Sequence, residues 1–65
     1  MKNNDRLCIY PKEAAILLGR TEKHCYKLFQ TIRDAYGLKA RSYISIRIFA
    51  DYTGLSEDEI RERLN

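Results

Sequence analysis

The spacing of apolar residues near the start of this chain changes phase once, at Gly19. Before Gly19, one side of a helix that should begin near Lys12 carries Ala14, Ala15 and Leu18. After it, one side of a second helix carries Cys25, Leu28, Phe29 and Ile32, because residues three and four apart lie on the same helix face. Gly19 can adopt a positive φ without a Cβ clash, and Thr21 can cap the second helix. The sequence therefore predicts two helices joined by a tight turn over residues 18–21.

The last third of the chain repeats this pattern at an offset of 35 residues, with 44–64 aligned on 9–29. The matching pairs are Ile9 and Ile44, Ala15 and Ala50, Gly19 and Gly54, Thr21 and Ser56, Glu22 and Glu57, and Cys25 and Ile60. Ser56 followed by Glu59 is also a capping-box arrangement. Such a repeat predicts a second pair of helices, near 45–53 and 56–64. Convergence on a common capped-helix pattern is the alternative to a duplication.

The predicted fold is all-α: one domain over residues 1–65, a compact bundle of about four helices made of two tandem helix-turn-helix-like units, with no clear wing. Residues 1–8 form a flexible arm in this prediction, with Lys2 and Arg6 able to reach a phosphate. The first unit spans 9–37 and includes a long helix over 21–36 that ends at Gly37. The second unit spans 44–64. Between them, 38–42 is a basic connector without a hairpin turn, and a short extended piece at 41–44 is possible.

Composition excludes several classes of protein. A hydrophobic content of 45% excludes a disordered tail. No apolar run approaches the roughly 18 residues of a membrane span, and the polar first residues predict no signal peptide. The two cysteines lack the spacing of a metal site, so we expect reduced thiols in a cytoplasmic protein. We expect no cofactor, no metal and no small-molecule substrate.

The stretch from Ile9 to Leu28, IYPKEAAILLGRTEKHCYKL, resembles the helix-turn-helix family of small prokaryotic and phage regulators. Ala15, Gly19 and Cys25 occupy the core positions of that family, and Leu18 and Leu28 occupy supporting apolar positions. Excisionase-like and MerR-like proteins of mobile elements are the most similar members. Cys25 stands where the family commonly has Val or Ile. The resemblance covers about a third of the chain and implies that the second helix enters the major groove of double-stranded DNA.

The resemblance assigns the DNA contacts to this second helix and its flanks. Lys23 and Lys27 suit guanine or phosphate, and Gln30 suits adenine. Glu22 must accept from a cytosine amino group or turn away, and we expect His24 to be a partly packed surface residue. An ordinary solvated face is the alternative for the two lysines and Gln30. The predicted DNA-binding residues are Arg20, Thr21, Glu22, Lys23, Tyr26, Lys27, Gln30, Lys39 and Arg41.

The two repeats differ in charge. Residues 9–29 carry a net charge of +2, whereas 44–64 carry −2, with Glu57, Asp58 and Glu59 in the first turn of the last helix. An acidic first turn complements the helix dipole but opposes phosphate. DNA binding is therefore assigned to the first unit, and the second unit braces it or presents a surface to another protein.

Two functions follow from this sequence. The first is a sequence-specific DNA-binding protein, either a small transcriptional regulator or an excisionase-like factor of a mobile element. Useful affinity then needs a homodimer, a cooperative array or a DNA-binding partner. The alternative is a protein-interaction module, an anti-repressor or adaptor, that uses the acidic last helix. An enzyme is not expected, because the adjacent His24 and Cys25 point about 100° apart on a helix.

Overall fold

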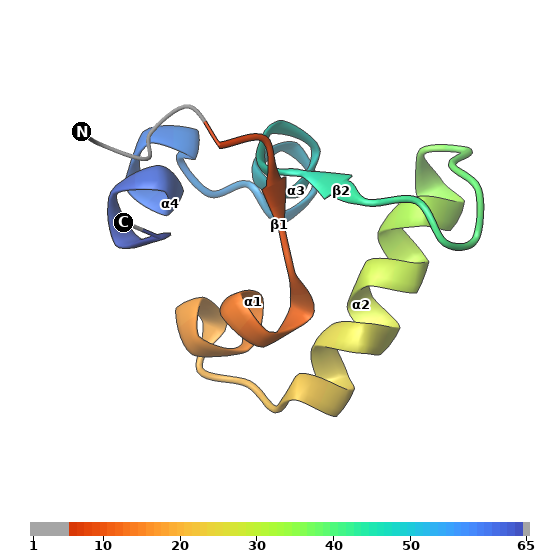
Figure 1. The fold of residues 1–65 in the computed structure, drawn as a ribbon, viewed down its shortest axis with the longest axis horizontal. Coiled ribbons are helices and arrows are strands. Elements are labelled where there is room, and N and C mark those ends of the chain that lie inside the picture. The colour runs from red at the N-terminus through yellow and green to blue at the C-terminus, as the bar shows by residue number, and fades with distance from the viewer. Residues whose placement is uncertain (1–5, 65) are drawn as a thin grey trace.

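The structure is a computed structural model that describes residues 6–64. In this part of the chain it contains four helices and two very short strands, so the predicted small all-α bundle is confirmed (Figure 1). The elements in chain order are β1 Cys8–Ile9, α1 Pro11–Leu18, α2 Glu22–Ala35, β2 Ile44–Ser45, α3 Ile46–Thr53 and α4 Glu57–Leu64.

Local sequence signals set the ends of α1. Pro11 opens the helix, where its missing N–H group costs nothing. The Glu13 carboxylate accepts a hydrogen bond of 3.1 Å from the Tyr10 backbone N–H. Gly19 ends the helix at a φ of 66° and donates its N–H to the Ala15 carbonyl. The helix therefore begins one residue before the predicted start and ends where the glycine was expected to end it.

Similar signals set the ends of α2. The Thr21 hydroxyl accepts a hydrogen bond of 3.0 Å from the His24 N–H and so caps the helix. After Tyr36, Gly37 has a φ of 67°, and the Leu38 N–H donates to the Arg33 carbonyl at 2.8 Å. Within the helix, the inward-facing side chains that are buried are Cys25, Phe29 and Ile32.

The second unit repeats these features. The Ser45 hydroxyl accepts from the Ile48 N–H at 3.0 Å and caps α3, which ends at Gly54 with a φ of 79°. The Gly54 N–H donates to the Ala50 carbonyl, as Gly19 donates to Ala15 in the first unit. The Ser56 hydroxyl accepts from the backbone N–H of Glu59 at 3.3 Å, at the start of α4.

The strands join the two units at equivalent positions. β1 and β2 pair antiparallel, with Ile9 opposite Ile44 and Cys8 opposite Ser45. Ile9 and Ile44 are the matched isoleucines of the repeat, and antiparallel pairing of matched residues is what a local two-fold rotation produces. β1 was not predicted, and the extended piece expected at 41–44 is shifted to Ile44–Ser45.

Part of the expected flexible arm lies outside the described residues, namely 1–5. The described part, residues 6–8, makes specific contacts with α1 and α4. The Arg6 guanidinium pairs with the Glu13 carboxylate at 2.6 Å and donates to the Cys8 carbonyl. The Arg6 carbonyl in turn accepts from the Arg61 side chain at 2.6 Å, which connects this segment to α4.

One hydrophobic core serves both units. Phe29 of α2 and Phe49 of α3 meet with their ring centroids 5.8 Å apart, and both are buried. Ala15 and Ala50, which are equivalent in the repeat, are each 8% exposed where a helix pair packs closely. The buried residues are Ile9, Ala14, Ala15, Cys25, Phe29, Ile32, Ile44, Ile46, Phe49, Ala50 and Ile60.

Candidate nucleic-acid interface

The outward face of α2 presents two lysines side by side. Lys23 and Lys27 are one turn apart and exposed, opposite the buried side chains of the same helix. Within residues 6–64 neither lysine has an ion-pair partner within 4.0 Å. Tyr26, on the same side of the helix, is 60% exposed. The first two turns of α2 therefore form a basic surface with an aromatic ring at its edge.

Gln30 lies further along this face, and its side chain already forms two hydrogen bonds within α2. Its side chain is half-buried, donates to the Asp34 carboxylate at 3.3 Å and accepts from the Arg33 guanidinium at 3.4 Å. A base contact by Gln30 requires exchange of these hydrogen bonds. Asp34 is exposed and acidic, so the basic surface of α2 ends before its last turn.

The turn before α2 adds polar groups at the helix N-terminus. Arg20, Thr21 and Glu22 are all exposed. The Thr21 hydroxyl accepts the capping hydrogen bond and keeps its own hydrogen for donation. His24 is also exposed. Together with Gly19, three of these side chains line a shallow hollow of about 560 Å³, namely Arg20, Thr21 and His24.

Arg33 holds the basic connector against the far end of α2, a role that the sequence analysis missed. Its Nε donates to the Ser42 carbonyl at 2.6 Å, and the Ser42 N–H donates to the Lys39 carbonyl at 3.0 Å. Lys39 and Arg41 are exposed on the loop fixed in this way. No local pattern in the sequence marks this contact, because Ser42 lies nine residues after Arg33.

The predicted residues fall into two groups along α2. Arg20 to Lys27 cluster around its N-terminal half, whereas Lys39 and Arg41 lie on the loop beyond its C-terminal end (Figure 1). Fourteen helical residues span about 20 Å at 1.5 Å per residue. The structure therefore places basic side chains at both ends of one rod and does not gather them into one pocket.

Two tyrosines adjoin the strand pair. Tyr10 and Tyr43 meet edge to face with centroids 6.1 Å apart, and Tyr43 is 74% exposed. The Arg6 guanidinium lies 6.0 Å from the centre of the Tyr10 ring. Like the strands, this aromatic pair was not predicted.

α4 carries the opposite charge at its surface. Glu57 pairs with Arg61 at 3.0 Å, whereas Asp58, Glu59 and Glu62 are exposed. Asp58 and Glu62 stand at the positions that match Lys23 and Lys27 in the repeat.

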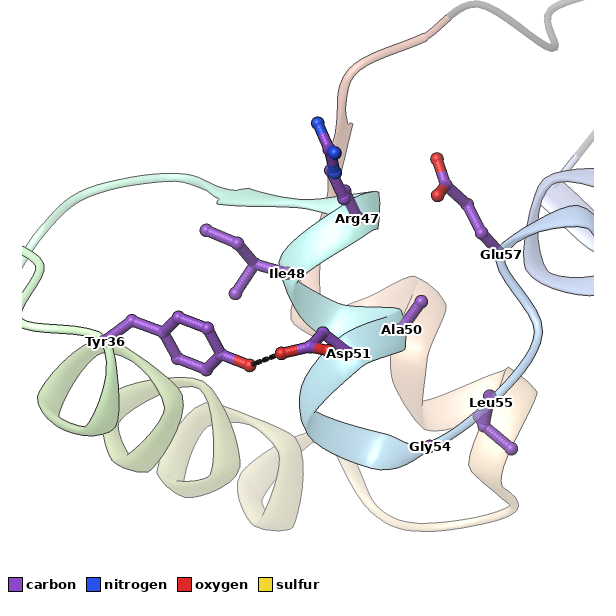
Figure 2. A pocket seen from close by; sticks show the side chains of 8 residues that line it. All are labelled: Tyr36, Arg47, Ile48, Ala50, Asp51, Gly54, Leu55 and Glu57. Atoms are coloured by element: carbon purple, nitrogen blue, oxygen red, sulfur yellow. Dashed lines mark hydrogen bonds between the residues drawn. The ribbon is translucent and has the colours of Figure 1, made fainter.

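A second hollow, of about 530 Å³, lies between the end of α2, α3 and the start of α4. Figure 2 shows Tyr36 reaching from α2 toward Asp51 of α3, and its hydroxyl donates to the Asp51 carboxylate. This hydrogen bond raises the pKa of Tyr36 above its ordinary 10.0. The contact joins the two units, and the hollow is also lined by Arg47 and Glu57 (Figure 2).

The cysteines of the described chain are both free, and Cys25 is fully buried. Burial raises the pKa of the Cys25 thiol above 9.0, and the neighbouring Arg20 opposes this only in part. The thiol therefore stays neutral and packs as a small apolar group. Residues 6–64 contain no cluster of three or more His, Cys, Asp or Glu side chains able to hold a metal ion.

No protein-family model, curated protein or solved structure matches this chain. None of the helices in residues 6–64 is both long and apolar enough to cross a bilayer.

Proposed function

We propose that this protein binds double-stranded DNA in a sequence-specific manner through α2. It would act in the cytoplasm as a small transcriptional regulator or an excisionase-like factor of a phage or other mobile element. The observation that carries the proposal is the pair Lys23 and Lys27, exposed on the outward face of a helix that a tight glycine turn presents. A single helix of this kind fits the major groove, where lysine can contact guanine or phosphate.

The flanking groups support the same proposal. Arg20 and the Thr21 hydroxyl lie at the N-terminus of α2, where positive partial charge favours a phosphate. Lys39 and Arg41 lie at the other end of α2, on the loop held by Arg33, within reach of a second stretch of the DNA backbone. Phosphate contacts at the two ends orient the helix, and side chains between them, Tyr26 and Gln30, meet the base edges.

The test is a fluorescence-anisotropy titration of the full chain against a labelled mixed-sequence duplex at 50 and 200 mM salt. With five basic side chains available, the slope of log affinity against log salt should fall between about −3 and −4.5. Selection from a random duplex pool should then enrich a defined site that binds at least about a thousandfold more tightly than unrelated DNA. Affinity that does not change with salt, or a pool without enrichment, contradicts the proposal.

A second function rests on α4. Asp58, Glu59 and Glu62 are exposed together on a short helix, which suits capture of a basic protein surface by an anti-repressor or adaptor. If this is the function, reversing the charges of these three residues abolishes partner binding. The wild-type protein then shows no salt-dependent affinity for DNA.

A further inference from the structure

An apolar groove lies between α1 and α4. One hollow of about 500 Å³ is lined by Ile16, Leu17 and Leu64, and a second of about 190 Å³ is lined by Leu17 and Leu55. Leu17 and Arg63 line both, so the two hollows adjoin each other. This groove is separate from the DNA-binding face proposed above, because none of the residues that line it belongs to that face, and α4 lies away from α2 (Figure 1).

Ile16 is the most exposed large apolar side chain in residues 6–64, at 81%. The repeat supplies an internal comparison, because the matching residue of α3 is Asp51. α1 and α3 have the same length and end at equivalent glycines. The fold therefore does not require an aliphatic residue at this position. Because Ile16 lines the same hollow as Leu17 and Leu64, covering it with another surface would remove a contiguous apolar area from water.

The charges at the edge of the groove are self-complementary. Glu59 and Arg63 lie one turn apart on α4 and line the groove. Within residues 6–64 neither has an ion-pair partner within 4.0 Å. When two copies of such a patch meet about a two-fold axis that passes between Glu59 and Arg63, the acid of each copy faces the base of the other.

We propose that the groove between α1 and α4 binds a second copy of this chain and forms a symmetric homodimer. Ile16, Leu17 and Leu64 of each copy form the apolar centre, and Glu59 pairs with Arg63 across the axis. The dimer leaves Lys23 and Lys27 uncovered. The proposal concerns this surface alone and does not depend on whether α2 binds DNA.

Sedimentation equilibrium of the full chain, from about 10 μM to 1 mM, tests this proposal, since a small interface predicts micromolar or weaker affinity. The wild type should show a reversible monomer–dimer equilibrium. Ile16→Glu should raise the dissociation constant about tenfold for each copy, and hence about a hundredfold for the dimer. Its circular dichroism spectrum should not change, because the side chain is already exposed. Leu7→Glu is the matched control, since Leu7 is 70% exposed and does not line the groove.

A charge exchange on α4 tests the symmetry of the contact. Glu59→Arg and Arg63→Glu should each weaken the dimer about tenfold, and the double exchange should return it to within about threefold of wild type. A wild type that is monomeric over the whole concentration range overturns the proposal. A dimer that Ile16→Glu leaves as tight as wild type also overturns it, because the two copies then meet through another surface.

Discussion

The two units of this small domain share a backbone plan and differ in what they expose. Each begins with a short strand, continues with an eight-residue helix and ends that helix at a glycine of positive φ. In each, a hydroxyl residue two positions later caps the next helix. The matched isoleucines even pair with each other in the two-stranded sheet.

The outward faces of α2 and α4 are nearly inverted in charge. Lys23 and Lys27 of the first unit are replaced by Asp58 and Glu62 in the second. All four side chains are exposed and none supports the core. The comparison teaches that the repeat preserves what the fold needs, and that the exposed positions are free to take different chemistry. Function therefore has to be argued from the surface of one unit and not from the fold that both share.

The largest expected effect is on the free energy of unfolding, because equivalent residues of the two units differ in burial. Phe29 is 1% exposed and packs on Phe49, whereas its equivalent Leu64 is only partly buried. Phe29→Ala should lower the free energy of unfolding by about 3–5 kcal/mol, a large part of the roughly 3–10 kcal/mol expected for a chain of this size. Leu64→Ala should cost about 1 kcal/mol. Urea denaturation followed by circular dichroism measures both, and equal losses would show that α4 is as deeply packed as α2.

The second largest expected effect is on DNA affinity and tests the charges of α2. Lys23→Glu with Lys27→Glu should weaken DNA binding at least about a hundredfold, because two attractive charges near phosphate become repulsive. The matched control is Asp58→Lys with Glu62→Lys, the equivalent pair on α4, which should leave affinity unchanged or slightly higher. Both variants should keep the wild-type circular dichroism spectrum. The control should unfold at a slightly lower midpoint, because Asp58 lies in the first turn of α4 and complements the helix dipole. Comparable losses from both pairs of substitutions would contradict the assignment of DNA binding to the first unit.

A third test asks whether the two glycine turns are energetically equivalent. Gly19 and Gly54 both have positive φ, and a Cβ added at either would meet no atom within 4 Å. Gly19→Ala and Gly54→Ala should therefore cost about the same, about 1–2 kcal/mol each from backbone strain alone. Thermal unfolding reads out both. A cost confined to one glycine would mean that the two turns are not equivalent in the folded protein.

The smallest expected effect is on the pH dependence of stability, and it comes from the hydrogen bond that links the two units. The hydrogen bond to Asp51 raises the pKa of Tyr36, so the folded state holds the phenolic proton more tightly than the unfolded state. Its stabilising contribution is complete below pH 10.0 and is lost as the pH rises through the raised value. The difference in melting temperature between wild type and Tyr36→Phe should be constant from pH 7 to 9 and should shrink above pH 10. A difference that grows above pH 10 would contradict this sign.

The helices could be predicted from the sequence because the signals that begin and end them are local. Gly19, Thr21 and Gly54 act through the residues next to them, and the observed helix ends differ from the predicted ones by about one residue. The strand pair could not be predicted, because two-residue strands carry no periodicity and the paired residues lie 35 and 37 positions apart in the chain.

The candidate site was predicted in part for the same reason. Exposure of Lys23 and Lys27 follows from helical periodicity around Cys25 and Phe29. The hydrogen bonds of Gln30 to Asp34 and Arg33 could not be predicted from periodicity, because they depend on side-chain rotamers. The attachment of the 38–42 loop depends on Arg33 meeting a backbone carbonyl nine residues away. Contacts of this kind leave no pattern in one sequence.

The most direct test of the central claim is to map the DNA-binding surface by NMR. Amide chemical shifts of the ¹⁵N-labelled chain are followed as an unlabelled duplex containing the selected site is added. The account predicts the largest changes in Arg20 to Gln30 and around Lys39 and Arg41, with α4 unaffected beyond any change caused by dimerisation. Changes centred on α4, or no changes in α2 at saturating DNA, would contradict it.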